Sequence, residues 1–171
     1  RLKTIVSDVF DLAKATTNTD VNLERIDAVI LMNQVLADME DKIAEYGREI
    51  KTSINAENVF IEAEGKKMCR VLQNIIDNAL KYSMNGTRIF ARLDSEDGRM
   101  KINVRNTASY EMTFTPDEIV ERFTRGDKAR TTEGSGLGLS IARSFTEACG
   151  GRFEILIDGD VFSVSIEFDE I

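Results

Sequence analysis

Two hairpin signals constrain the fold of this chain more strongly than any other feature. Each signal is an Asp-Gly dipeptide between two segments in which apolar and polar residues alternate. The segments are residues 87–93 and 99–105 around Asp97-Gly98, and residues 153–157 and 161–168 around Asp158-Gly159. Alternation is typical of a half-buried strand, and Asp-Gly between two strands is typical of a tight turn. We therefore expect two antiparallel hairpins.

Three stretches with a helical spacing of apolar residues alternate with the strand segments. They are residues 28–46, 66–82 and 137–149. Glycine follows the first stretch and the third, as is common at helix C-termini. Shorter alternating segments add expected strands at 21–27, 49–54 and 59–63. Helices on one face of a mixed, mostly antiparallel sheet predict an α+β fold, a two-layer sandwich in which three helices cover the sheet.

A further short helix is expected within residues 107–133, which otherwise show no long period. Thr115 is a good N-cap, Pro116 suits the first helical position, and Glu118 follows the Thr by three residues. This combination is a capping box and predicts a helix start.

The first residues of the chain form a helical seam. Leu2, Ile5, Val9 and Leu12 recur at alternating spacings of three and four, as in a coiled coil. Such a short seam is not stable alone, so we expect the end of a longer helix that packs on a partner helix. An ordinary amphipathic helix of this domain is the alternative. Polar residues 16–20 are interpreted as a hinge, and because the chain starts at Arg1 without Met we expect a fragment of a longer protein.

Composition excludes several kinds of function. The net charge is −8, which argues against a surface built for nucleic-acid phosphates. The chain contains no His, so Ser-His and Cys-His catalysis and His-rich metal sites are excluded. Cys69 and Cys149 lie within apolar helical patterns, and we expect inert core thiols of a reducing compartment. No apolar run approaches the roughly 20 residues of a membrane span.

The helix expected at 66–82 has two unlike faces. Its apolar face comprises Leu72, Ile75, Ile76 and Ala79, and its opposite face comprises Asn74, Asn78 and Lys81. Asn is a weak helix former, so two of them one turn apart require an explanation. Their amide oxygens suit Mg²⁺, which takes few protein ligands and keeps several waters, and Lys81 can meet a phosphate. A solvated helix face is the alternative.

A glycine run, GSGLGL at residues 134–139, opens the helix expected at 137–149. Glycines allow an anion to approach the backbone, and the start of a helix offers unpaired N–H groups. The run neither follows a strand nor contains Gly-Lys-Ser/Thr, so it is neither a dinucleotide-binding turn nor a Walker loop. Basic residues are concentrated just before it, at 122–130, which suggests a mobile lid over phosphates. A flexible hinge and a solvated basic loop are the alternatives, and Phe123 is interpreted most simply as an apolar anchor of that loop.

Together these motifs resemble the ATP-binding catalytic domain of sensor histidine kinases, within the superfamily of gyrase, heat-shock chaperone and mismatch-repair ATPases. NIIDNALKY at 74–82 is similar to the N box, ERFTRGD at 121–127 to the F box, and GSGLGL at 134–139 to the second glycine box. The resemblance covers about residues 20–171, and residues 1–19 are similar to the end of the dimerisation helix with its hinge.

The resemblance implies that ATP and Mg²⁺ bind between the N-box helix and the lid. Asn78 and Asn74 are the implied metal ligands. The implied nucleotide-binding residues are Asn74, Asn78, Lys81, Tyr82, Asn106, Phe123, Arg125, Arg130, Gly134, Ser135, Gly136, Leu137, Gly138 and Leu139.

The sequence departs from the family pattern at the first glycine box. The family usually has Asp-x-Gly-x-Gly after a strand, whereas this chain has Asn106 followed by Thr-Ala-Ser-Tyr. Asn106 takes the place of the Asp that reads the adenine amino group, and its amide oxygen can still accept that hydrogen bond. We expect weaker ATP binding than the family norm.

The resemblance also implies a reaction and partners. The ATP-hydrolysing relatives carry a Glu at the position of Asn74; without that base, we expect a kinase of two-component phosphorelay signalling and not a hydrolase. Since the chain has no His, the phosphoacceptor would lie on the dimerisation domain of a homodimer, outside this chain. A response regulator is the implied second partner, and a cytoplasmic domain of a membrane sensor is the implied location. A non-catalytic nucleotide-binding or docking module is the alternative.

Overall fold

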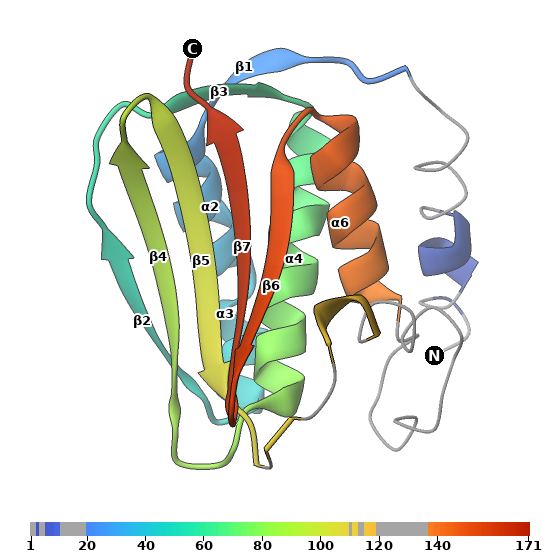
Figure 1. The fold of residues 1–171 in the computed structure, drawn as a ribbon, viewed down its shortest axis with the longest axis vertical. Helices are drawn as coiled ribbons and strands as arrows, with labels where there is room; N and C mark the ends of the chain where they lie inside the picture. The colour runs from blue at the N-terminus through green and yellow to red at the C-terminus, as the bar shows by residue number, and fades with distance from the viewer. Residues whose placement is uncertain (1–2, 4–5, 11–19, 110, 113–114, 119–136) are drawn as a thin grey trace.

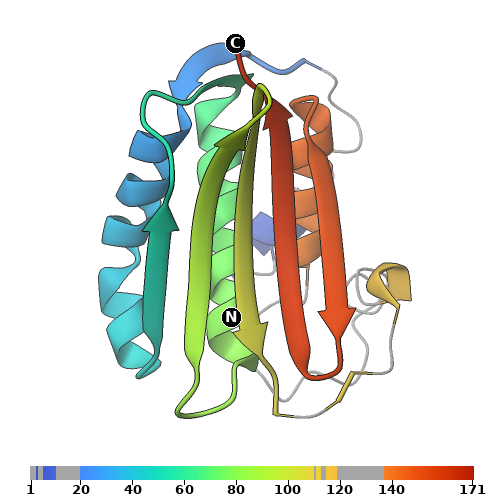
Figure 2. The same cartoon turned by 60° about the vertical axis from the view of Figure 1, so that its left-hand side comes forward.

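The computed structural model describes residues 3, 6–10, 20–109, 111–112, 115–118 and 137–171. Its strands and helices form two layers, a sheet and a layer of helices on one of its faces (Figures 1 and 2). In chain order they are β1 (Glu24–Asp27), α2 (Ala28–Asp38), α3 (Glu40–Glu45), β2 (Glu49–Ile54), β3 (Phe60–Ala63), α4 (Gly65–Tyr82), β4 (Arg88–Glu96), β5 (Arg99–Thr107), α6 (Gly138–Ala148), β6 (Arg152–Asp158) and β7 (Val161–Asp169). The predicted two-layer α+β sandwich is confirmed.

The main sheet has five strands in the order β2-β4-β5-β7-β6. β2 is parallel to β4, and the other three pairs are antiparallel, so the sheet is mixed and mostly antiparallel as expected. β1 and β3 pair separately as a two-stranded antiparallel sheet, which crosses the upper end of the sandwich in Figure 1. Both strands were expected, but their pairing apart from the main sheet was not.

Both hairpins form at the Asp-Gly dipeptides. Asp97 and Gly98 have φ of 52° and 73°, the left-handed conformation that a two-residue hairpin turn requires at both central positions. Gly159 has φ of 62° in the turn between β6 and β7. The predicted hairpins are therefore confirmed, with strand ends that lie within three residues of the predicted ones.

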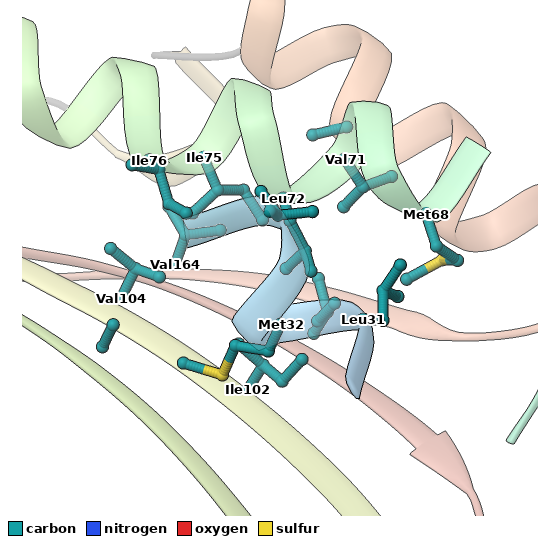
Figure 3. Close-up of a cluster of buried hydrophobic side chains, with 14 of the residues drawn as sticks. Leu31, Met32, Met68, Val71, Leu72, Ile75, Ile76, Ile102, Val104 and Val164 are labelled. Atoms are coloured by element: carbon teal, nitrogen blue, oxygen red, sulfur yellow. The ribbon is translucent and has the colours of Figure 1, made fainter. Parts of the chain in front are cut away.

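The core lies between the sheet and the helices. α4 is central: its buried side chains meet those of α2 on one side and those of β5 and β7 below (Figure 3). Seven of its side chains are buried, namely Met68, Val71, Leu72, Ile75, Ile76, Ala79 and Leu80. Full burial of one large aliphatic side chain stabilises the fold by about 1.5–3 kcal/mol. This packing holds α4 in a fixed orientation on the sheet.

One helix differs from its prediction. The sequence predicted a single helix over 28–46, whereas the structure has α2 and α3 with Met39 between them. Met39 has φ −96° and ψ 3°, outside the helical range, although its N–H still donates to Val35 O and its O accepts from Ile43 N. The break is a local change of backbone angles at a buried side chain, which apolar spacing does not encode.

The structure also bears on several smaller expectations, of which the short helix with its capping box is confirmed. Residues 116–118 are helical, and Thr115 and Glu118 exchange the two hydrogen bonds of a capping box, at 3.2 and 3.3 Å. The described residues at 6–10 are helical. Cys69 and Cys149 are free thiols, and burial raises the pKa of each, so neither is a reactive thiolate at neutral pH. Within the described part of the chain, no helix is long and apolar enough to cross a membrane.

Candidate functional site

The expected site divides between described and undescribed residues. Asn74, Asn78, Lys81 and Tyr82 on α4, Asn106 on β5, and Leu137, Gly138 and Leu139 at the start of α6 are described. Phe123, Arg125, Arg130, Gly134, Ser135 and Gly136, together with the F box and the lid, lie outside the described residues.

The outer face of α4 carries the polar residues. Asn74, Asn78, Lys81 and Tyr82 are all half-buried, in contrast to the fully buried apolar face. The helical period separates the two faces, as the sequence predicted. Half-burial means that these side chains are neither part of the apolar core nor fully solvated.

Asn74 and Gly138, the described glycine of the glycine run, come together in space. α4 and α6 lie side by side and run in opposite directions, so the start of α6 lies beside the second half of α4 (Figures 1 and 2). A Cβ placed on Gly138 would lie 3.7 Å from Cβ and 3.7 Å from Cγ of Asn74, and 3.9 Å from Asn74 Oδ1. The backbone of Gly138 therefore faces the Asn74 side chain at close range.

The start of α6 is suited to an anion. Leu137 is its N-cap residue, and a Leu side chain has no atom that can accept a hydrogen bond from the first N–H groups. The first turn of a helix carries a partial positive charge and orphan N–H donors, which attract phosphate. Leu137 and Leu139 are buried and anchor this turn to the core, while Gly138 is half-buried.

Asn74 has an unsatisfied amide group. Its Nδ2 is fully buried and has no hydrogen-bond partner among the described residues. Buried polar atoms are nearly always paired, so an orphaned donor beside a helix start is a candidate ligand-binding group.

Lys81 has a partner that the sequence analysis overlooked. Its ammonium lies 2.8 Å from Asp77 Oδ2, and the ammonium of Lys42 on α3 lies 2.6 Å from Asp77 Oδ1. Burial raises the pKa of Asp77, but the bonds to Lys42 and Lys81 outweigh it, so the pKa lies below its usual value. The spacing of four residues between Asp77 and Lys81 was a visible signal for this ion pair.

Asn106 occupies a buried position near the end of β5. It is 2% exposed, and neither Oδ1 nor Nδ2 has a hydrogen-bond partner among the described residues. β5 ends beside the end of α4, because Met84 N–H donates to Thr107 O at 2.8 Å and Ser83 bridges to Ala108. Asn106 therefore lies one residue before the point at which β5 contacts the C-terminal end of α4, the end that carries Lys81 and Tyr82.

The residues present fit a metal that takes few protein ligands. Among the described residues, no cluster of three or more His, Cys, Asp or Glu side chains could enclose an ion. Mg²⁺ in nucleotide sites needs no such enclosure, since phosphate and water supply most of its oxygens. The amide oxygens of Asn74 and Asn78 suit that chemistry.

Comparison with known proteins identifies the family. The family described as "Histidine kinase-, DNA gyrase B-, and HSP90-like ATPase" matches residues 63–170. The chain belongs to this family, which confirms the resemblance drawn from the sequence motifs. Membership of an ATPase family implies that the nucleotide is ATP.

Individual relatives are sensor histidine kinases. The chain is 32% identical over 159 residues to the sensor protein kinase WalK of Staphylococcus saprophyticus, which covers 89% of this chain and 25% of that kinase. The chain thus spans about a quarter of the length of the curated relative. Full-length ShkA in complex with AMPPNP aligns with a TM-score of 0.80 and 25% identity, over 99% of this chain and 36% of that one. The histidine kinase AdeS of Acinetobacter baumannii shares the fold, with a TM-score of 0.76 and 18% identity over 98% of this chain and 78% of that one.

Proposed function

We propose that the chain is the catalytic domain of a sensor histidine kinase, which binds Mg²⁺·ATP and transfers the γ-phosphoryl group to a His on a dimerisation domain. The observation that carries this proposal is the apposition of Asn74 and Gly138, at 3.7 Å from the position of a Cβ on the glycine. It brings the N-box helix close to Gly138, which belongs to the described end of the second glycine box, and supports a site in which a phosphate chain contacts both. Residues 20–171 would form this domain, and residues 1–19 the end of the dimerisation helix and its hinge.

The described residues suit the binding of a nucleoside triphosphate. Asn78 and Asn74 would supply amide oxygens to Mg²⁺, and the N–H groups at Gly138 and Leu139, in the turn that begins at Leu137, would donate to phosphate oxygens. Bound Mg²⁺ would neutralise negative charge on the transferred phosphoryl group. Lys81, Tyr82, Arg125 and Arg130 would add positive charge and hydrogen bonds, Gly134, Ser135 and Gly136 would complete the glycine box, and Phe123 would contribute from the F box.

The residue at position 74 favours transfer over hydrolysis. A neutral amide cannot take a proton from water, whereas a Glu could act as a general base, and loss of such a base costs a factor of about 10²–10⁴ in rate. Phosphoryl transfer to a His nucleophile requires mainly positioning and charge stabilisation. Asn74 is therefore compatible with a kinase and disfavours an ATPase.

The proposal names partners outside this chain. The chain contains no His, so the phosphoacceptor must belong to another segment or protein. We propose the homodimeric dimerisation domain as acceptor, a response regulator receiver domain as the next partner, and a cytoplasmic position within a membrane sensor. The similarity to WalK over a quarter of its length supports this arrangement.

A transfer assay tests the kinase proposal. The chain is mixed with the separately produced dimerisation domain of its full-length protein and with ATP labelled at the γ-phosphate. We expect acid-labile label on the dimerisation domain, none on this chain, and none on either with Asn78→Ala. Stable label on this chain itself would contradict the proposal.

A non-catalytic nucleotide-binding or docking module is the second candidate. It is favoured by one observation, namely that Asn106 and the residues after it lack the family's first glycine box. The same assay separates the two candidates, because such a module would bind nucleotide or the dimerisation domain tightly without any transfer of label.

A further inference from the structure

The amide of Asn106 is the most unusual buried polar group in the described part of the chain. The residue is 2% exposed, yet both its oxygen and its nitrogen lack hydrogen-bond partners among the described residues. A buried amide without hydrogen-bond partners lowers the stability of the fold, so its presence in a native structure indicates a functional role such as ligand binding.

The register of β5 determines which way Asn106 points. Met100, Ile102, Val104 and Asn106 alternate with less buried residues, and side chains two apart in a strand share a face. The first three belong to the core beneath the helices. Asn106 therefore continues the helix-facing row of β5 at the end where β5 meets α4.

An amide and a carboxylate present different atoms to a purine base. A carboxylate only accepts hydrogen bonds, whereas an amide has one accepting oxygen and one donating NH₂ group. The edge of adenine has a donating amino group at C6 and an accepting N1. The edge of hypoxanthine has the reverse pattern, an accepting oxygen at C6 and a donating N1–H. An amide matches adenine in one orientation and hypoxanthine after a rotation of 180°.

Nothing in the described structure fixes that orientation. In many buried asparagines, one protein donor or acceptor determines which end of the amide faces which way. Here neither Oδ1 nor Nδ2 is held by a described residue, so the rotation breaks no hydrogen bond to the described part of the chain. A carboxylate at the same position has no donor, so it can pair with only one edge atom of either base, the C6 amino group of adenine or the N1–H of hypoxanthine.

We propose that Asn106 makes the site bind both 6-aminopurine and 6-oxopurine nucleoside triphosphates. This inference rests on the proposed function and on the place that the family resemblance implies for Asn106, against the C6 edge of the base. It names the substrate class of the site as purine nucleoside triphosphates, with selectivity against the 6-oxo group lost at this position.

Titration calorimetry with Mg²⁺·ATP and Mg²⁺·ITP tests the inference. ITP is the better probe than GTP because it changes the C6 edge without adding an amino group at C2. For the unaltered chain we expect the dissociation constants of ATP and ITP to agree within about tenfold, the range of one neutral hydrogen bond. In Asn106→Asp we expect both affinities to weaken by about 10- to 100-fold, since a carboxylate oxygen then faces one acceptor of each base, N1 of adenine or the C6 oxygen of hypoxanthine.

Asn103→Asp is the matched control. Asn103 lies on the same strand, on the opposite face, and its Nδ2 donates to Ser165 Oγ at 2.7 Å. The same chemical change there should leave the affinities for both ATP and ITP unaltered. Circular dichroism of each variant reports whether it is folded, and the ratio measured on the unaltered chain needs no variant.

Three outcomes are decisive. Binding of ATP with ITP weaker by about 100-fold or more in the unaltered chain would overturn this inference and leave the proposed function standing. Unchanged affinity for both nucleotides in folded Asn106→Asp would also overturn it, because Asn106 would then not read the C6 edge. Failure of the unaltered chain to bind either nucleotide would overturn the inference and the proposed function together.

Discussion

Replacement of Gly138 by Ala should weaken nucleotide binding without lowering the stability of the fold. Gly138 is the first residue of α6, and it is not among the described glycines with positive φ. An added Cβ would meet Asn74 Cβ and Cγ at 3.7 Å and Asn74 Oδ1 at 3.9 Å. These are ordinary van der Waals distances, so the methyl group fits. Since Ala loses less backbone entropy than Gly, we expect an unchanged free energy of unfolding or a gain of up to about 0.5–1 kcal/mol.

The same methyl group should damage nucleotide binding. A phosphate oxygen that hydrogen-bonds to the first N–H groups of α6 must approach the backbone to about 2.9 Å. The Cβ added by Gly138→Ala would lie between that backbone and Asn74, next to the place at which the proposal has the phosphate contact both. Loss of one hydrogen bond to a charged group costs about 1.5–3 kcal/mol, so we expect affinity for Mg²⁺·ATP to fall by about 10- to 100-fold.

Gly151→Ala is the matched control, at the other end of α6. A Cβ there would lie 2.5–2.8 Å from three ring atoms of Phe168, which is 3% exposed. Overpacking of this kind costs about 1–3 kcal/mol. We therefore expect opposite behaviour, namely a destabilised chain whose folded fraction still binds nucleotide normally.

Urea denaturation and titration calorimetry measure the two properties independently. If Gly138→Ala lowers the free energy of unfolding by more than about 1 kcal/mol, α4 and α6 are closer than the structure indicates. If it leaves affinity unchanged, the bare backbone at Gly138 is not a phosphate contact, and the main support for the proposed function is lost.

Two further predictions concern α4. Asn78→Ala should abolish Mg²⁺-dependent nucleotide binding. It should leave the thermal unfolding transition nearly unchanged, because the side chain is half-buried and outside the apolar core. An unchanged nucleotide affinity in titration calorimetry would contradict the assigned site. Asp77→Asn should destabilise the chain by about 1–2 kcal/mol at pH 7, since two ion pairs weaken. The pKa of Asp77 is lowered in the folded state, so its contribution is present at neutral pH and is lost as the pH falls below about 4 and passes through that lowered value. The stability difference between the two forms should therefore shrink between pH 7 and about pH 3, and a constant difference would show that the charge of Asp77 is not responsible.

Local patterns in the sequence predicted the elements that local physics determines. The Asp-Gly turns require left-handed backbone angles that Asp97 and Gly98 adopt, and the apolar stripe of α4 follows directly from the helical period. The parallel pairing of β2 with β4 and the separate β1–β3 sheet join strands that lie far apart in the sequence. No local spacing encodes such pairings, so these parts of the fold could not be predicted from the sequence.

The candidate site, like the fold, could be predicted only in part from the sequence. That Asn74 and Asn78 share the polar face of α4 could be predicted from their spacing, but the proximity of Asn74 to Gly138 depends on how α4 and α6 pack. The burial of Asn106 with two unpaired amide atoms among the described residues also depends on tertiary packing, since alternation along β5 indicates the face and not the partners. The ion pair of Asp77 with Lys81 was predictable from their spacing, but its second partner Lys42 comes from another helix.

The pair of lysines around Asp77 reconciles the observed ion pair of Lys81 with its proposed role at phosphate. Two ammonium groups share one carboxylate, so the cluster has a net positive charge. If Lys81 turns toward a phosphate, Lys42 still neutralises Asp77, and no half-buried carboxylate is left without a partner. Lys42→Gln removes the second ammonium group, so Asp77 would lose its remaining ion pair when Lys81 turned toward a phosphate. We therefore expect the affinity for Mg²⁺·ATP to fall by about two- to fivefold. Lys51→Gln, which removes an exposed lysine paired with Glu49, is the control and should have no effect. Equal affinities in the two variants would mean that Lys81 stays on Asp77 when nucleotide binds.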